Sequence, residues 1–280
     1  MMRYTARFFL PVVAFCCLAA GVFTAANRDA GAVKALSLPP EGMVEIPEGV
    51  FHMQVEYRWR EGLTNDTLIV DALGYRYRTT STLDIPAYYI DRTEVTNRDY
   101  KAFLDATGYQ PVWPENFLKH WTDGSYPSGL DDHPVVWVSL EDAHAYAEWA
   151  GKRLPTEAEW QKAAQGTDGR TWPWGGLFDP QKANTDSEGT LPVGSFPDGA
   201  SPYGVLDMAG NVWEWTDSWQ TDGYHEYSWL RGGSYFHAKG SLWYMQGGPV
   251  AVYQRTKFWH MTPALNRTPT IGFRCVMDVS

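Results

Sequence analysis

The sequence predicts an α/β mixed (α+β), loop-rich single domain, and three observations point to it. The 280 residues include 26 glycines and 18 prolines, with 14 tryptophans and 16 tyrosines, which is typical of a fold with many turns and much irregular backbone. Short apolar runs typical of strands alternate with a few capped amphipathic stretches typical of helices. The chain is long enough for one large domain, which we place at residues 41–280.

The N-terminal segment has the features of an export signal. Arg3 and Arg7 flank the start of an apolar core at residues 8–23, and the small residues 24–26 offer a cleavage site. We therefore expect residues 1–26 to be a cleaved signal peptide and residues 27–40, which lack periodicity and end in two prolines, to be a linker.

Two alternatives to cleavage stay open. Residues 8–26 are also long enough for an uncleaved membrane anchor. Cys16 and Cys17 allow a lipoprotein, although Phe15 stands where a small residue is required. Each alternative predicts a domain outside the cytoplasm, periplasmic or envelope-associated, with membrane contact only through the N-terminal segment.

Charge and cysteine content exclude further classes of protein. Acidic residues outnumber basic ones by 33 to 23 without a cluster of lysine or arginine, so nucleic acid is not an expected partner. Of the three cysteines, only Cys275 lies beyond the N-terminal segment. The exported domain would therefore contain no internal disulfide and no pair of thiols working together.

The first part of the domain predicts strands. Residues 43–47 and 50–53 are short apolar runs, and residues 84–91 form another. Between them, residues 54–83 are polar and aromatic and are predicted to be an insertion with a turn at Asn65 and Asp66.

Three helices follow, each with an N-cap residue and an acid three positions later. The cap pairs are Thr96 with Asp99, Ser139 with Asp142, and Thr156 with Glu159. Glycines at 108, 151 and 166 are predicted to end these helices, and residues 109–135 between the first two form a long loop. Arg153, Glu157 and Glu159 are expected to tie helix ends together.

A tryptophan-rich stretch at residues 203–219 is the centre of the sequence. Gly210 and Asn211 suit the positive φ of a tight turn, and an extended segment after them would place Trp213 and Trp215 on one face and Glu214 on the other. A buried carboxylate must be paired, because burying a lone charge is costly. Glu214 therefore needs backbone amides, a basic side chain or a cation.

This stretch, together with RLPTEAEW at 153–160 and RGGSY at 231–235, resembles the sulfatase-modifying-factor family, whose founding member is the formylglycine-generating enzyme. The resemblance extends over residues 41–278 and implies the C-type-lectin-like formylglycine-generating-enzyme fold of that family. The family enzyme oxidises a substrate cysteine with two cysteines that hold copper(I). The corresponding positions here are His237 and Leu242, so copper is not expected and the catalytic pair is missing.

Calcium is the one cofactor that the resemblance implies. It places a first site at Asn211, Glu214 and the Val212 carbonyl, with hard oxygen ligands, and a second at Asn184 and Thr185. The structural alternative is that Glu214 pairs with a backbone amide or an arginine and Asn211 only forms the turn.

A candidate binding groove lies where the family's substrate groove would form. Residues 242–249 are apolar, aromatic and glycine-containing, and we assign to the groove His237, Trp243, Tyr244 and His260. The alternative for the segment is repacking around the lost active site, and the alternative for the histidines is ordinary polar contacts.

The favoured function is an exported, non-catalytic binding or scaffold protein that contacts protein partners in the cell envelope. The rival is a periplasmic metal-dependent oxidoreductase of the same fold that does not use the cysteine pair, since histidines also ligate iron or copper. A formylglycine-generating enzyme comes third. Whether the chain is an enzyme is left open, with the missing thiols favouring a pseudoenzyme.

Overall fold

The computed structural model describes residues 38–58, 67–71, 74–185, 187–221, 223–236, 248–260 and 263–279. Pro39–Ser280 forms one compact unit. The predicted signal peptide and all but the end of the predicted linker lie outside the described residues. None of the helices in the described ranges is long and apolar enough to cross a bilayer.

The strands form four small sheets. The first is antiparallel and has the order β1 (Met43–Ile46), β5 (Tyr88–Asp91) and β12 (Val276–Asp278). The second has the order β10 (Thr256–His260), β7 (Glu226–Arg231), β6 (Trp213–Thr221) and β11 (Ile271–Gly272). The third has the order β2 (Gly49–Arg58), β4 (Gly74–Ile85) and β3 (Thr67–Asp71), and the fourth pairs β8 (Gly233–Ser234) with β9 (Gly248–Pro249).

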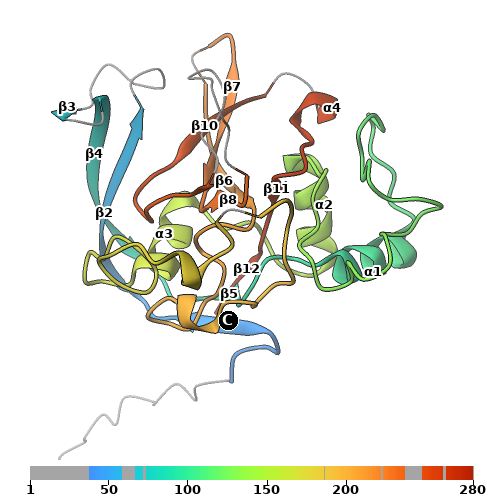
Figure 1. Ribbon diagram of the computed structural model, residues 1–280, viewed down its shortest axis with the longest axis horizontal. Helices are drawn as coiled ribbons and strands as arrows, with labels where there is room; N and C mark the ends of the chain where they lie inside the picture. Colours follow the sequence, from blue (N-terminus) through green and yellow to red (C-terminus); the bar gives the residue numbers. More distant parts are fainter. Residues whose placement is uncertain are drawn as a thin grey trace, which may run out of the picture. The chain divides into compact units, whose positions relative to one another are not determined.

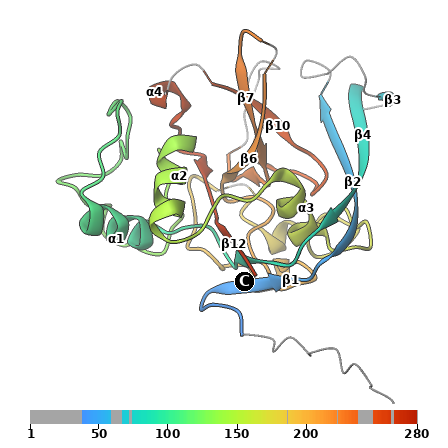
Figure 2. The same ribbon diagram turned by 180° about the vertical axis from the view of Figure 1, so that it is seen from behind.

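The second sheet carries the central stretch of the sequence. Within β6, Glu214 pairs with Arg231 of β7 on one side and with Gly272 of β11 on the other. The β6–β11 pairing is parallel, and the β6–β7 pairing is antiparallel with a register shift after Trp215. In Figures 1 and 2 this sheet lies between the β2–β4 pair and the two helices α1 and α2.

The predicted helices are present with their predicted caps. They are α1 (Asn97–Thr107), α2 (Leu140–Trp149) and α3 (Glu157–Gln165), with a further short helix α4 (Pro263–Asn266) and the 3₁₀ turns η2 (Pro180–Lys182) and η3 (Pro197–Gly199). All three long helices begin with a complete capping box, in which cap side chain and third residue bond each other's backbone N–H. The second helix ends at Trp149, and its cap is Ala150, one residue before the predicted Gly151.

Two groups of buried side chains make up the core. One packs α1 and α2 against β6 and β11 and includes Tyr100, Phe103, Tyr146, Trp213 and Trp215. The other packs α3 against β1, β2 and β5 around Trp160. The indoles of Trp213 and Trp215 share the first group, as the predicted alternation of β6 requires.

The predicted insertion at residues 54–83 is corrected by the structure. Most of its described residues are strand, because β2 runs on to Arg58 and β4 returns antiparallel beside it, with β3 on the far side of β4. The predicted turn at residues 65 and 66 lies outside the described residues. The single strand predicted at residues 84–91 is instead the end of β4 and all of β5, divided at Pro86, which has no N–H to donate to a ladder.

Candidate functional site

A tight turn at Gly210 and Asn211 joins three segments of the chain. Both residues have positive φ, 88° and 56° respectively. A Cβ on Gly210 would lie 2.3 Å from the carbonyl oxygen of Asn184, so only glycine allows this approach. The N–H of Asn211 donates to that carbonyl at 3.0 Å, and the N–H of Gly210 donates to the carbonyl of Gly232 at 3.0 Å.

The side chains of Asn184 and Asn211 are buried and in contact. Asn184 Nδ2 donates to Asn211 Oδ1 at 3.1 Å, and the backbone N–H of Leu191 donates to the same oxygen at 3.0 Å. Asn211 Nδ2 in turn donates to Glu94 Oε1 at 3.1 Å. Two residues that the resemblance assigned to separate calcium sites therefore belong to one hydrogen-bond network, with Thr185 next to Asn184 in the chain.

Glu214 is fully buried and paired with an arginine. Its Oε2 accepts from Arg274 Nε at 2.7 Å and its Oε1 from Arg274 Nη2 at 2.8 Å, which makes a two-point ion pair. The indole N–H of Trp160 also donates to Oε2, at 2.8 Å. Of the three kinds of partner that the sequence allowed for this carboxylate, the structure shows a basic side chain.

This pairing bears directly on the predicted calcium site at Asn211, Val212 and Glu214. Both oxygens of Glu214 bond Arg274, so an ion there would compete with the guanidinium, and the donors do not fit calcium as the side chains stand. Within the described ranges, no cluster of three or more His, Cys, Asp or Glu side chains is arranged to hold a metal. Calcium stays a prediction that chelation tests, since an ion that binds only the folded state raises its melting temperature.

The Glu94 carboxyl of this network has a second carboxyl group, that of Asp207, beside it. Burial raises the pKa of Glu94 well above its ordinary value, and the neighbouring Asp207 carboxyl acts in the same direction. Burial likewise raises the pKa of Asp207, whose Oδ2 accepts from the Gly194 N–H at 2.6 Å. Among the described residues, Glu94 Oε2 has no hydrogen-bonding partner. A protonated Glu94 can therefore reside here without adding a second buried negative charge to that of Glu214.

Sequence reasoning assigned no role to Glu94, Asp207 or Arg274. The need of Glu214 for a partner was a usable signal, and Arg274 stands in the matched GFRC segment. Which arginine pairs with Glu214 depends on the parallel pairing of β6 with β11, because this pairing brings together residues that are 60 positions apart in the chain. No local sequence pattern indicates such a pairing.

A buried ionic network supports the RGGSY segment. Arg231 has no exposed surface, and its Nη1 contacts Glu157 Oε1 at 3.1 Å while its Nη2 donates to the Val252 carbonyl at 2.8 Å. Glu157 Oε2 also pairs with Arg255, at 2.6 Å. Burial lowers the pKa of Arg231 to about 10. Glu157 was expected to tie helix ends together; its ion pairs with Arg231 and Arg255 instead join the start of α3 to β7 and to the segment before β10.

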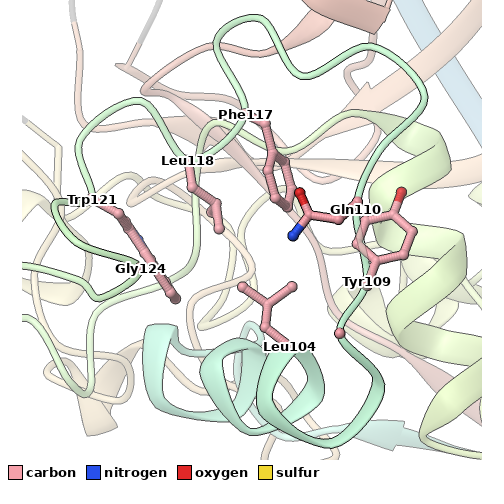
Figure 3. Close-up of a pocket in the computed structure, with 8 residues that line it drawn as sticks. Leu104, Tyr109, Gln110, Phe117, Leu118, Trp121 and Gly124 are labelled. Atoms are coloured by element: carbon pink, nitrogen blue, oxygen red, sulfur yellow. The ribbon is translucent and has the colours of Figure 1, made fainter.

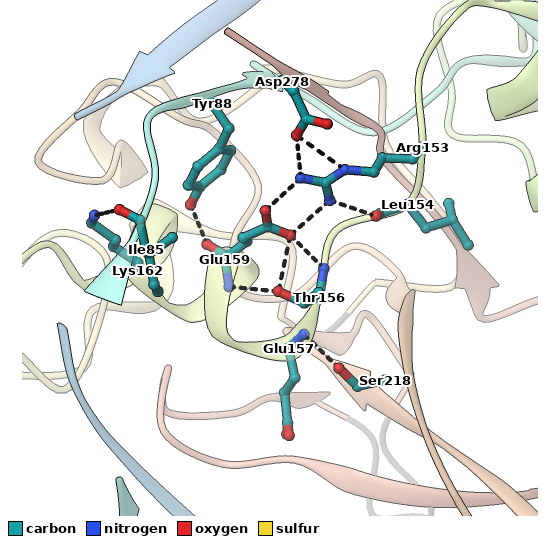
Figure 4. A network of polar contacts seen from close by, with 10 residues as sticks. All are labelled: Ile85, Tyr88, Arg153, Leu154, Thr156, Glu157, Glu159, Lys162, Ser218 and Asp278. Carbon is teal, nitrogen blue, oxygen red and sulfur yellow. Dashed lines mark hydrogen bonds and ion pairs between the residues drawn. The ribbon is translucent and has the colours of Figure 1, made fainter. Parts of the chain in front are cut away.

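The start of α3 is joined to the C-terminal strand in the same manner (Figure 4). Arg153 donates to Oε2 and Oε1 of Glu159 at 2.8 and 2.6 Å and to Asp278 of β12 at 2.6 Å. Lys162, in the next turn of α3, donates to the carbonyl of Pro47 at 2.6 Å. These contacts explain the RLPTEAEW motif as a structural junction.

His260 is the one described member of the predicted groove. Its Nε2 lies 2.6 Å from Ser228 Oγ, and its Nδ1 lies 3.1 Å from Asn266 Nδ2. Burial lowers the pKa of His260, which favours the neutral ring. His237, Trp243 and Tyr244 lie outside the described residues, so the groove itself stays a prediction.

Cys275 is a free, fully buried thiol in the first core group. Burial raises the pKa of this thiol well above its ordinary value, and the nearby Asp91 carboxylate raises it further. Because the thiolate is the reactive and metal-binding form, Cys275 behaves as a small apolar core residue.

Comparison with known proteins shows the family. The protein-family model described as "Sulfatase-modifying factor enzyme 1-like domain" matches residues 29–279 of the sequence. The chain therefore belongs to this family. The formylglycine-generating enzyme of Thermomonospora curvata is 34% identical over 237 residues, which cover 66% of this chain and 74% of that protein. The bovine formylglycine-generating enzyme is 32% identical over 238 residues, covering 65% of this chain and 59% of that protein.

Proteins with other names are also similar to this chain. The hercynine oxygenase of Mycolicibacterium smegmatis is 38% identical over 164 residues, covering 49% of this chain and only 38% of that protein. Among solved structures, PvdO from Pseudomonas aeruginosa matches with a TM-score of 0.60 at 23% identity, covering 85% of this chain and 94% of that one. CarF matches with a TM-score of 0.54 at 24% identity, with coverage of 85% and 98%. These neighbours confirm the predicted α+β formylglycine-generating-enzyme fold.

Proposed function

We propose that this chain is an exported, non-catalytic binding or scaffold protein that contacts a protein partner at the cell envelope. The observation that carries the proposal is the replacement of the family's thiol pair. Histidine and leucine occupy positions 237 and 242, where the family resemblance implies cysteines. The one cysteine beyond the N-terminal segment, Cys275, is buried in the core with a raised pKa. Soft thiolates suit copper(I), so the loss of the cysteine pair argues against oxidation of cysteine by the family's route.

The fold is well suited to presenting a binding surface. Buried ion pairs hold together α3 and β7, through Glu157 and Arg231, and β6 and the segment between β11 and β12, through Glu214 and Arg274. Loops such as residues 109–135 extend from this rigid scaffold. Loops supported in this way are common sites of recognition, because sequence can vary there without loss of the core.

An assay for formylglycine tests the proposal. The full chain, loaded with copper(I) and mixed with a cysteine-containing sulfatase peptide, is expected to leave the peptide cysteine unchanged in the mass spectrum. The Thermomonospora curvata enzyme serves as the active control under the same conditions. Conversion of the peptide by the wild-type chain, and loss of that conversion in His237→Ala, would contradict the proposal.

A metal-dependent oxidoreductase is the second candidate function. It is favoured by His260, whose neutral ring can ligate a metal, and by a relative named as an oxygenase in the same family. The ordinary hydrogen-bond distances from His260 to Ser228 and Asn266 weigh against it, since both ring nitrogens already have protein neighbours.

A further inference from the structure

A pocket lies between the C-terminal end of α1 and the loop that follows it (Figure 3). It holds about 340 Å³, which falls within the size range of small-ligand sites. Leu104 enters it from α1, and Phe117, Leu118 and Trp121 face Leu104 from the loop. This pocket shares no lining residue with the turn at Gly210 or with the predicted groove.

The loop that forms the pocket is held in place by a buried arginine. Arg267 pairs with Asp142 of α2 through Nε at 2.7 Å and Nη2 at 3.0 Å. Its Nη1 donates to the backbone carbonyls of Trp113 and Glu115, the latter at 2.9 Å. These bonds attach the loop to α2, so the pocket is preformed and a ligand need not order it.

The backbone at the pocket wall is also constrained. Leu118 has a φ of 45°, which is uncommon for a residue with a Cβ, and its N–H donates to the Trp137 carbonyl at 3.0 Å. Residues kept in such conformations occur often at ligand-binding sites, where surrounding contacts hold them. The strained residue here is one of the side chains that lines the pocket.

The lining determines the chemistry of the ligand. Among the described residues that line the pocket, none carries a charge, and most present apolar or aromatic surface. The Gln110 amide reaches in between Leu104 and Phe117 (Figure 3), and within the described ranges it has no hydrogen-bonding partner. A primary amide offers both donors and an acceptor. The pocket therefore suits an uncharged aromatic ring with one polar edge.

We propose that the pocket receives the side chain of a tyrosine or tryptophan presented by a protein partner. This inference rests on the proposed binding function and names the part of the partner that is recognised. The same loop exposes 88% of Val112 and 55% of Trp113, which gives flanking residues of a partner apolar surface to cover. Buried tyrosine and tryptophan anchors commonly dominate the affinity of protein interfaces.

Titration with capped amino acids tests this proposal. N-acetyltyrosinamide and N-acetyltryptophanamide are added to the full chain while amide resonances are followed by NMR. We expect saturable shifts at Leu104, Phe117 and Leu118 with a Kd on the order of 1 mM, as suits fragments of this size. N-acetyl-leucinamide should bind at least tenfold more weakly, because it has no polar edge for Gln110.

Two variants locate the binding. Gln110→Ala should weaken the binding of N-acetyltyrosinamide about tenfold, which corresponds to the loss of one hydrogen bond. Because Gln110 is exposed, the substitution should leave the melting temperature unchanged. Leu104→Arg should abolish binding. Leu265→Arg is its matched control, because it places the same charge at an exposed leucine of α4 and should bind like wild type.

Several results would overturn the inference. They are the absence of saturable shifts at 10 mM ligand (about ten times the expected Kd), equal affinity for the leucine derivative, and unchanged affinity in Gln110→Ala. Binding of free phenol or indole without binding of the capped residues would identify a small-molecule site and reject a protein anchor. None of these results affects the proposal of a non-catalytic protein, which the formylglycine assay tests separately.

Discussion

Glu214 and Arg274 are each completely buried, and each is the principal charged partner of the other. Their two-point contact connects β6 to the segment between β11 and β12, directly behind the turn at Gly210. The Glu214 carboxylate also raises the pKa of Arg274 against the opposing effect of burial, which keeps the guanidinium charged. The central carboxylate of the tryptophan-rich stretch is therefore engaged in a buried ion pair.

Removing one partner of this pair should be strongly destabilising. Glu214→Gln leaves the buried Arg274 guanidinium without its principal countercharge, and we expect the free energy of unfolding to fall by about 3 kcal/mol in denaturant titrations. The control is Asp132→Asn, which breaks the exposed pair with Arg98 and should lower the free energy by less than about 1 kcal/mol. Equal effects of the two substitutions would show that the buried pair has no special importance.

The lowered pKa of His120 leads us to expect that the stability of the fold depends on pH. Burial lowers the pKa of His120 to about 4, below its unfolded value of about 6.5. The folded state binds this proton more weakly than the unfolded state, so the stability contribution is complete above pH 6.5 and is lost as the pH falls toward 4. Melting temperatures of wild type and His120→Gln should therefore diverge over this range, with wild type losing more. Parallel curves would contradict the assignment.

At the scale of elements, helix ends are the best-specified features of the chain. The side chains of Thr96, Ser139 and Thr156 each accept from a backbone N–H three residues later, as the sequence indicates. Such caps are readable because each depends on four consecutive residues. The segment between α2 and α3 contains Arg153, whose side chain donates to Asp278 of β12.

The Thr156 cap should contribute measurably to stability. Thr156→Ala removes the acceptor of the Glu159 N–H and is expected to lower the free energy of unfolding by about 1 kcal/mol. Thr156→Ser keeps the hydroxyl and should retain most of the stability, measured by the same denaturant titration. A serine variant as unstable as the alanine variant would indicate that the methyl group of Thr156 matters and the cap does not.

The β2–β4–β3 sheet shows what the sequence could not predict. In β2, Phe51, Met53 and Val55 are buried in alternation, which is a detectable pattern. In β4, the described side chains between residues 78 and 84 are exposed or half-buried, and only the end of the strand, at Leu83 and Ile85, packs against the second core group among the described side chains. The rest of the described strand is joined to β2 by backbone pairing and by the ion pair of Arg78 with Glu56. Residues 78–82 of β4 are all polar and carry no hydrophobic period, and they were therefore assigned to an irregular insertion.

At the scale of the whole molecule, the fold alone does not determine the function. Relatives of this chain are named formylglycine-generating enzyme and hercynine oxygenase, while the fold is shared with PvdO and CarF. A shared scaffold does not determine the chemistry of its loops. Composition, helix caps and turn residues indicated a mixed, loop-rich α and β domain, and the particular architecture was predictable only through the family resemblance of the RLPTEAEW, GNVWEW and RGGSY segments.

The candidate site was less predictable than the fold for a physical reason. The turn residues Gly210 and Asn211 have local conformational signatures, and both adopt the positive φ that was expected. The partner of Glu214 and the burial of Glu94 depend on contacts between segments distant in the chain. The pocket beside α1 likewise arises from a loop held by Arg267, which lies more than a hundred residues further along.

Elemental analysis of the purified full chain, with no metal added, tests the central claim most directly. A non-catalytic binding protein should contain neither iron nor copper in stoichiometric amount, and it should consume no oxygen in the presence of thiol substrates. Stoichiometric iron or copper in the wild-type chain that is lost in His237→Ala or His260→Ala would contradict the claim and identify a metal-dependent oxidoreductase.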